Sequence, residues 1–405
     1  MGEYGSTATG DAALHTAGFT LPAAPIAQPL YESLAVLLLV PILLSVAAWN
    51  GFPIIFYDTG AYMLQGLGHV FVAERSPIYS TFLNVTGGAV SLWLVALAQC
   101  TITAFVMTQF ARALRPQMSL WILLAIGAVL CLATGLPWYA AQIEPDCFVA
   151  IVPLTLYLLA FHDQDLGGPR KPLLFAAAAI AIACHPSHIP LASGLLAAIA
   201  ALRFAPRRFV EANGLPRPRV MLGVASLCVA IVAIFAANYA FTRHVFFSRS
   251  GMIFLEARIM EDGLIKPVLD ADCAGVHYDI CPYKDHLPAR ADTWLWMVNQ
   301  SPFKKLGGFE KRGREASLLV HESLTRYPLE NAIVALEDGL LQFFWFQTAT
   351  GSCRRNGCST ASSRSPSRSR SAPTTTPISR RARSPLCRST SCMCRWRSWG
   401  LGRSI

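Results

Sequence analysis

Charged side chains are scarce in this sequence. Asp, Glu, Lys and Arg make up only 14% of its 405 residues, and 53% are hydrophobic, whereas a soluble globular protein has about 25% charged residues. So few charges exclude an ordinary water-facing surface. The apolar segments are unbroken runs rich in Leu and Ala, without the alternation of a membrane β-strand. Because backbone groups in a bilayer must be bonded internally, the composition predicts an all-α integral membrane protein, a polytopic helical bundle.

Several motifs are also missing. Residues 1–30, interpreted as a flexible N-terminal segment, contain no Lys or Arg, which argues against a cleavable signal peptide. The sequence has no phosphate-binding glycine loop, no HExxH motif and no paired CxxC motif. These absences argue against a nucleotide-driven pump and a zinc peptidase.

Residues 350–405 lack Asp, Glu and Lys altogether but hold 12 Arg and five of the 12 Cys. The remaining residues carry 22 basic and 24 acidic groups, so the net charge of +10 comes from this tail. One interpretation is a disordered basic arm that contacts nucleic acid or anionic lipid. The abrupt change in composition favours a second interpretation, in which the tail is the disordered out-of-frame product of a frameshifted or truncated gene. No nucleic-acid partner is therefore predicted.

About seven spans are expected, followed by a mixed polar segment at 243–349. The apolar runs lie at 34–50, 89–111, 119–141, 147–161, 172–187, 188–203 and 220–242. Since a perpendicular span needs about 20 residues, the short runs are expected to be tilted or partly interfacial. The sequence therefore divides into a transmembrane domain at 31–242 and an extracytoplasmic segment with juxtamembrane helices.

The distribution of Lys and Arg decides between one helix and two at 172–203. Pro186 and Pro190 interrupt this stretch, and a proline inside a helix removes a backbone bond. With two helices and a cytoplasmic N-terminus, every basic residue between spans but Arg75 lies inside, as the positive-inside rule requires. These inside residues are Arg112, Arg115, Arg170, Lys171, Arg203, Arg207, Arg208, Arg217 and Arg219. Two helices are therefore predicted.

The loops on the other side are rich in acids, His and Tyr. The first outer loop contains Phe56-Tyr57-Asp58-Thr59-Gly60-Ala61-Tyr62 and then Glu74-Arg75-Ser76-Pro77-Ile78-Tyr79. A later one contains Glu144-Pro145-Asp146, and another contains His185 and His188. The simple alternative is that polar loops must lie somewhere, but loops built from Asp, Glu and His without Lys are unusual for solvation alone.

These motifs resemble the GT-C superfamily of membrane glycosyltransferases, which use lipid-phosphate-linked sugars. Asp58 matches the acidic residue after the first span, Ser76-Pro77-Ile78-Tyr79 the Pro-Pro-Leu-Tyr-like stretch, and Asp146 the later acid. The resemblance covers about 31–345. The sequence departs from the family pattern in two ways: Asp58 stands alone where the family usually has an acidic pair, and the later helices and the C-terminal domain are missing. It implies catalytic roles for Asp58 and Asp146. The expected substrate-binding residues are Tyr57, Tyr62, Glu74, Arg75, Tyr79, Glu144, His185 and His188.

The chemistry of sugar transfer is consistent with these residues. A base must take the acceptor proton, which suits Asp58, and a cation must hold the leaving phosphate, which suits Arg75, Arg243 or Arg249. The structural alternative for Asp58 is an N-cap of a helix at 61–67. Asp146 has the same alternative at the start of the fourth span.

Cys184, His185 and His188 surround a proline turn. His and Cys are good metal ligands, but no third ligand is local, so a polar or substrate-binding turn is favoured. No metal site is predicted, and the need for a cofactor, including a divalent metal, stays open.

Cys273 and Cys281 lie in the polar segment after the seventh run. If this segment is outside, it lies in an oxidising compartment, where disulfides persist. The seven residues between the two cysteines can close a loop. The sequence therefore predicts a disulfide between them.

The sequence is interpreted as a glycosyltransferase in a bacterial-type inner membrane, acting at its periplasmic face. Its expected partners are membrane lipid and a polyprenyl-phosphate sugar. The alternative is a transporter or flippase whose outer acids and His bind a cation or polar solute. Transporters place such groups near the bilayer midplane, so acids at span ends favour the enzyme.

Overall fold

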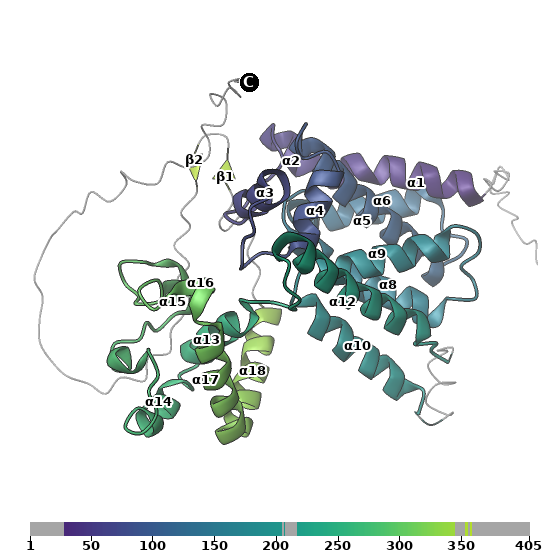
Figure 1. Ribbon diagram of the computed structural model, residues 1–405. Coiled ribbons are helices and arrows are strands. Elements are labelled where there is room, and N and C mark those ends of the chain that lie inside the picture. The colour runs from purple at the N-terminus through teal and green to yellow at the C-terminus, as the bar shows by residue number, and fades with distance from the viewer. Residues whose placement is uncertain (1–27, 205, 207–216, 345–352, 355–356, 359–405) are drawn as a thin grey trace, which may run out of the picture.

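The computed structural model describes residues 28–204, 206, 217–344, 353–354 and 357–358. These residues are mostly helical and form a large bundle followed by a smaller helical unit (Figure 1). The bundle is built from α1 (Gln28–Leu43), which the short α2 (Ser45–Asn50) extends, and from α5 (Leu92–Leu114), α6 (Leu120–Ala133), α8 (Ile151–Phe161), α9 (Arg170–Cys184), α10 (His188–Leu202) and α12 (Met221–Thr242). Short helices α3 (Thr59–Gly68), α4 (Pro77–Val85), α7 (Leu136–Ala140) and the 3-10 helix η1 (Pro145–Phe148) lie at one end of the bundle.

Three helical segments are long and apolar enough to cross a membrane. They are Gln28–Asn50, which joins α1 and α2, then Leu92–Leu114 and Met221–Thr242. Shorter apolar helices occupy Leu120–Ala133, Pro145–Phe161 and His188–Leu202. A membrane protein with helical spans is therefore supported, whereas the count of seven spans stays a prediction.

The stretch 172–203 forms two helices, α9 and α10, as predicted. Between them, His185 has an extended backbone and Ser187 is at the N-cap position of α10. Pro186 lies in this turn, where its missing N–H costs no helical hydrogen bond. The turn reverses the chain, so α9 and α10 run back along each other and both pack on α8 and α12.

Basic residues gather at the end of the bundle opposite α3 and α4. Asp163 pairs with Lys171 at 2.6 Å and with Arg219 at 3.3 Å, and Arg170 lies 3.6 Å from Glu32. Segments far apart in sequence thus meet at this end, which we call the basic end. The end with α3, α4, α7, η1 and the α9–α10 turn is called the site end. The structure thus places these basic residues and the helices α3 and α4 at opposite ends of the bundle, and the orientation of the two ends in a membrane stays a prediction.

The second unit has a hydrophobic core of its own. It comprises α13 (Gly251–Glu261), α14 (Lys266–Asp272), the 3-10 helix η2 (Cys281–Tyr283), α15 (Ala291–Trp296), α16 (Gly308–Lys311), α17 (Gly313–Arg326) and α18 (Pro328–Phe343). Ile253, Leu269, Trp294, Phe303 and Leu319 are central to its core. The juxtamembrane helices expected in the segment 243–349 include α13, α17 and α18. The unit follows α12 at the site end of the bundle (Figure 1).

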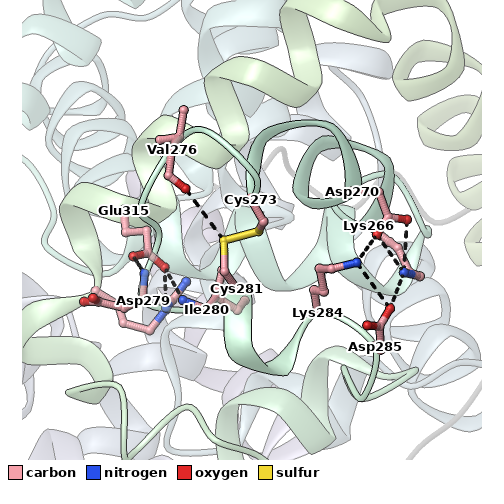
Figure 2. The surroundings of a disulfide bond; sticks show 11 residues. Lys266, Asp270, Cys273, Val276, Asp279, Ile280, Cys281, Lys284, Asp285 and Glu315 are labelled. Carbon is pink, nitrogen blue, oxygen red and sulfur yellow. Dashed lines mark hydrogen bonds and ion pairs between the residues drawn. A yellow bond between two sulfur atoms is a disulfide. The ribbon is translucent and has the colours of Figure 1, made fainter.

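The structure joins Cys273 and Cys281 in a disulfide, the pairing expected from the sequence, with their Cα atoms 5.7 Å apart. Figure 2 shows the closed loop held on both sides. On one side, the Glu315 carboxylate accepts hydrogen bonds from the backbone N–H groups of Asp279 and Ile280. On the other, Lys284 donates to Asp270 at 2.8 Å. The disulfide therefore belongs to a loop that is fixed to α17 and α14.

Most of the predicted disordered tail lies outside the described residues, as does the N-terminal segment up to residue 27. The tail residues that the structure describes form two very short antiparallel strands, β1 (Cys353–Arg354) and β2 (Gly357–Cys358). The out-of-frame interpretation stays a prediction.

Gly66 allows α3 to lie directly on α4, and its replacement should loosen the site end. A Cβ atom at Gly66 would lie 2.3 Å from the backbone oxygen of Ser80, and backbone can yield only by separating the helices. We expect Gly66→Ala to lower stability by about 1–3 kcal/mol, measured by thermal unfolding in detergent. Gly194→Ala in α10 is the matched control, because no atom lies within 4 Å of its added Cβ. Equal unfolding temperatures for both variants would contradict the close contact.

Candidate functional site

Two loops of the site end are bonded to each other. The N–H of Ile143 donates to the carbonyl of Ile54 at 2.8 Å, and the Thr59 hydroxyl donates to the carbonyl of Ile143, also at 2.8 Å. The Thr59 oxygen also accepts from the N–H of Phe56. These bonds bring the segment of Asp58 beside that of Glu144 and Asp146, although more than 80 residues separate Thr59 from Ile143.

Asp58 occupies the N-cap position of α3 but does not cap it. Its backbone oxygen accepts from the N–H groups of Ala61 and Tyr62, whereas its side chain makes no capping hydrogen bond. The carboxylate instead accepts a hydrogen bond from the guanidinium of Arg75. The side chain is 29% exposed, so one face stays open. The capping alternative is therefore wrong for this carboxylate.

Arg75 is held between two aromatic rings. Its guanidinium carbon lies 5.8 Å from the ring centre of Tyr62 and 5.7 Å from that of Trp296 in α15. The same side chain donates to the carbonyl of Glu74 at 3.1 Å. Cation–π contacts and the ion pair both stabilise this arginine. It therefore positions Asp58, and its guanidinium is already engaged.

The carboxyl groups at this end affect one another. Burial raises the pKa of Asp58, Arg75 opposes this shift, and the charges of Asp146 and Glu74 add to it. Burial, followed by the charges of Asp146 and Asp58, raises the pKa of Glu144 to about 8. With a pKa of about 8, Glu144 carries a proton at neutral pH.

Buried aromatic residues pack against the site loops from the core of the bundle. The rings of Tyr62 and Tyr79 meet edge to face at 4.9 Å, and the Tyr79 hydroxyl donates to the side-chain oxygen of Gln99 at 3.1 Å. The Gln99 amide donates to the carbonyl of Gln142 at 2.7 Å. Tyr62 and Tyr79 are almost fully buried, so they shape the floor of the site, while Tyr57 is exposed beside Phe56.

Asp146 lies beside the two histidines of the α9–α10 turn. One potential ligand atom from each of Asp146, His185 and His188 lies within 4.8 Å of the others. Asp146 is exposed and His188 is buried. Asp146 sits inside η1, whose N-cap is Glu144, and α8 begins only at Ile151. Asp146 therefore does not cap α8, which was the structural alternative for this residue. The fold instead brings its carboxylate to the two histidines as a third potential metal ligand.

A pocket opens next to these groups. Its lining includes Glu74, Arg75, Ser76 and Pro77 from the loop before α4, Pro186 from the α9–α10 turn, and Phe71, Ile234, Asn238, Phe246 and Arg249. The guanidinium of Arg249 stacks over the rings of Phe71 and Phe246 at 5.4 and 4.6 Å. No carboxylate pairs with Arg249 among the described residues. This pocket therefore combines apolar walls with an available cation.

The structure thus brings together Asp58, Glu74, Arg75, Glu144, Asp146, His185 and His188, with Tyr62 beneath them. Arg243 lies over Tyr239 and outside the pocket lining. No motif or spacing marks Thr59, Gln99 or Trp296 as a site residue. Thr59 and Gln99 make their bonds to backbone groups of a distant loop, and Trp296 comes from the second unit.

Comparisons with protein-family models, with curated proteins and with solved structures found no match to this chain.

Proposed function

We propose that this protein is a membrane glycosyltransferase that moves a sugar from a polyprenyl-phosphate carrier to an acceptor hydroxyl, at the periplasmic face of a bacterial-type inner membrane. One observation carries the proposal. A partly buried carboxylate, Asp58, is held by Arg75 at the end of the bundle opposite the basic end, beside a pocket that contains Arg249. The positive-inside rule would place that end on the non-cytoplasmic side of the membrane.

The reaction needs a base at the acceptor. The acceptor oxygen attacks the anomeric carbon of the sugar, the bond from that carbon to the phosphate oxygen breaks, and the carrier phosphate leaves with the bonding electrons. Asp58 takes the acceptor proton. Arg75 keeps one carboxylate oxygen in place, and the partial exposure of the side chain leaves room for the acceptor.

The carrier phosphate is assigned to Arg249. Guanidinium groups bind phosphate through paired, charge-assisted hydrogen bonds, and Arg75 is committed to Asp58. Phe71, Ile234 and Phe246 line the same pocket, and their apolar surfaces suit the first isoprene units of the carrier. Carboxylates at the bundle end, not along the middle of the long helices, also favour this function over transport.

Loss of the Arg249 guanidinium should weaken donor binding. We expect Arg249→Gln to reduce the affinity for a polyprenyl-phosphate sugar by about 10- to 100-fold, since hydrogen bonds to charged groups contribute about 1.5–3 kcal/mol. The assay is binding of a radiolabelled donor to the full chain in lipid nanodiscs, with sugar transfer measured in parallel. Arg290→Gln is the matched control, because Arg290 is an exposed arginine of the second unit outside the pocket lining. Equal affinities for the two variants would contradict the phosphate role, and a parent chain that transfers no sugar would overturn the proposed function.

A further inference from the structure

The two histidines at the α9–α10 turn present the same ring nitrogen. In His188, Nδ1 lies 2.7 Å from the carbonyl oxygen of Ala181, to which it donates. In His185, Nδ1 lies 2.7 Å from the hydroxyl of Ser187, and the backbone N–H of Ser187 also donates to it at 3.3 Å. Nε2 of each ring is left for another ligand, and in His185 it has a free lone pair when Nδ1 carries the proton and donates to the Ser187 hydroxyl. Histidines that bind metals commonly have this arrangement, in which the second nitrogen is fixed by a carbonyl or another polar group.

The surroundings hold this pair in place. Ser76 donates to the carbonyl of Ala183 at 3.2 Å, which ties the loop before α4 to the end of α9. The rings of His185 and His188 are 5.5 Å apart, and His188 is only 1% exposed. Asp146 reaches the pair from η1, a separate segment of the chain. Three ligands from two elements therefore converge on one point at the site end.

We propose that Asp146, His185 and His188 bind one Zn²⁺ ion. A set of two histidines and one carboxylate, with the fourth position open, is typical of catalytic zinc sites. Around a tetrahedral ion with bonds of about 2.1 Å, ligand atoms lie roughly 3.4 Å apart. The three ligand atoms lie within 4.8 Å of one another, so binding the ion requires only small movements of the side chains.

The open fourth position would let the ion bind a substrate oxygen. Pro186 lies within the histidine turn and also lines the pocket with Arg249, so a ligand at the fourth position would border the donor site. Zinc acts there as a Lewis acid toward a phosphate oxygen and stabilises the charge that develops on the leaving carrier. This substrate role rests on the proposed function, whereas metal binding does not.

Metal content of the purified chain tests the site. The full chain is prepared without an affinity tag, equilibrated with a limited excess of Zn²⁺ and a competing chelator, and measured by mass spectrometry of the metal. We expect one Zn²⁺ per chain and an affinity about 100-fold lower or worse in Asp146→Asn, His185→Ala and His188→Ala. The control is His162→Ala, since His162 also neighbours an aspartate, Asp165, but at the basic end.

Cobalt substitution separates this site from the cysteines of the tail, Cys353, Cys358, Cys387, Cys392 and Cys394. Co²⁺ bound by two His and one Asp gives visible d–d bands without the near-ultraviolet band of a cobalt–thiolate bond. We expect those bands in the parent and in His162→Ala, and their loss in Asp146→Asn, which changes an exposed residue and leaves packing intact. A parent without stoichiometric zinc, a thiolate spectrum, or variants that bind as tightly as the parent would overturn the site. Zinc binding without sugar transfer would support the metal site and reject the transferase. Sugar transfer without zinc binding would support the transferase and reject the metal site.

Discussion

Replacing Asp58 with Asn should lower sugar transfer by about 10²- to 10⁴-fold, the usual contribution of a general base, while donor binding remains at the parent level. The substitution keeps the shape of the side chain and one oxygen that can accept from Arg75. It removes the basic oxygen that takes the acceptor proton. Since the donor phosphate is assigned to Arg249, binding and chemistry should separate in this variant.

The pH profile provides a second measurement of the same role. Burial raises the pKa of Asp58 above its usual value, and a base acts only when deprotonated. Transfer by the parent should therefore rise with pH as Asp58 loses its proton, and this limb of the profile should disappear in the Asn variant. Asp165→Asn is the control, because Asp165 is exposed at the basic end. Parent-level transfer by Asp58→Asn would reject the base role and favour the transporter alternative.

Replacing Arg312 with Met should destabilise the second unit by about 3–5 kcal/mol, because it leaves a buried carboxylate without its partner. Arg312 donates to Glu256 of α13 and, at 2.8 Å, to Glu315 of α17. The side chains of Arg312 and Glu256 are 1% and 0% exposed. Glu315 in turn accepts from the disulfide loop, so the loss should spread from α17 to that loop. Unfolding followed by the fluorescence of Trp294, which lies under the Arg312 guanidinium, measures the effect.

Two further variants identify the cause. In Glu256→Leu with Arg312→Met, both charges are gone, and we expect most of the stability to return, since apolar replacement of a buried ion pair is often neutral or stabilising. Lys266→Met removes an exposed lysine that pairs with Asp270 and Asp285, and it should cost at most about 1 kcal/mol. If Arg312→Met were no more harmful than Lys266→Met, the buried pair would not stabilise this unit.

The helices of this protein follow from local features of the sequence. The apolar runs determine where helices form, the basic residues separate the two ends of the bundle, and Pro186 marks the break between α9 and α10. The disulfide also follows from local sequence, because a short polar loop with two cysteines has one way to close. Each of these features depends on residues that are near one another in the chain.

The composition of the site could not be predicted in the same way. Asp58 and Arg75 both stood out as candidates, but their pairing depends on how the loop before α4 folds back over α3. This pairing engages Arg75, which is why the proposed function assigns the phosphate to Arg249. Likewise, Asp146 meets His185 only because η1 packs against α9, a tertiary contact without a signal in the spacing of these residues.

The position of α9 has a consequence for how the chain enters the bilayer. Seven of its 15 residues are alanine or cysteine, and its buried face packs mainly against α8, α10 and α12. A short helix with one face against protein needs less affinity for lipid than an isolated span. It is therefore expected to insert together with α10, as a hairpin against α8, with α12 packing on it afterwards. A nascent chain released before this hairpin would expose Asp146 without either histidine, so the two sides of the site come together only after the hairpin has formed.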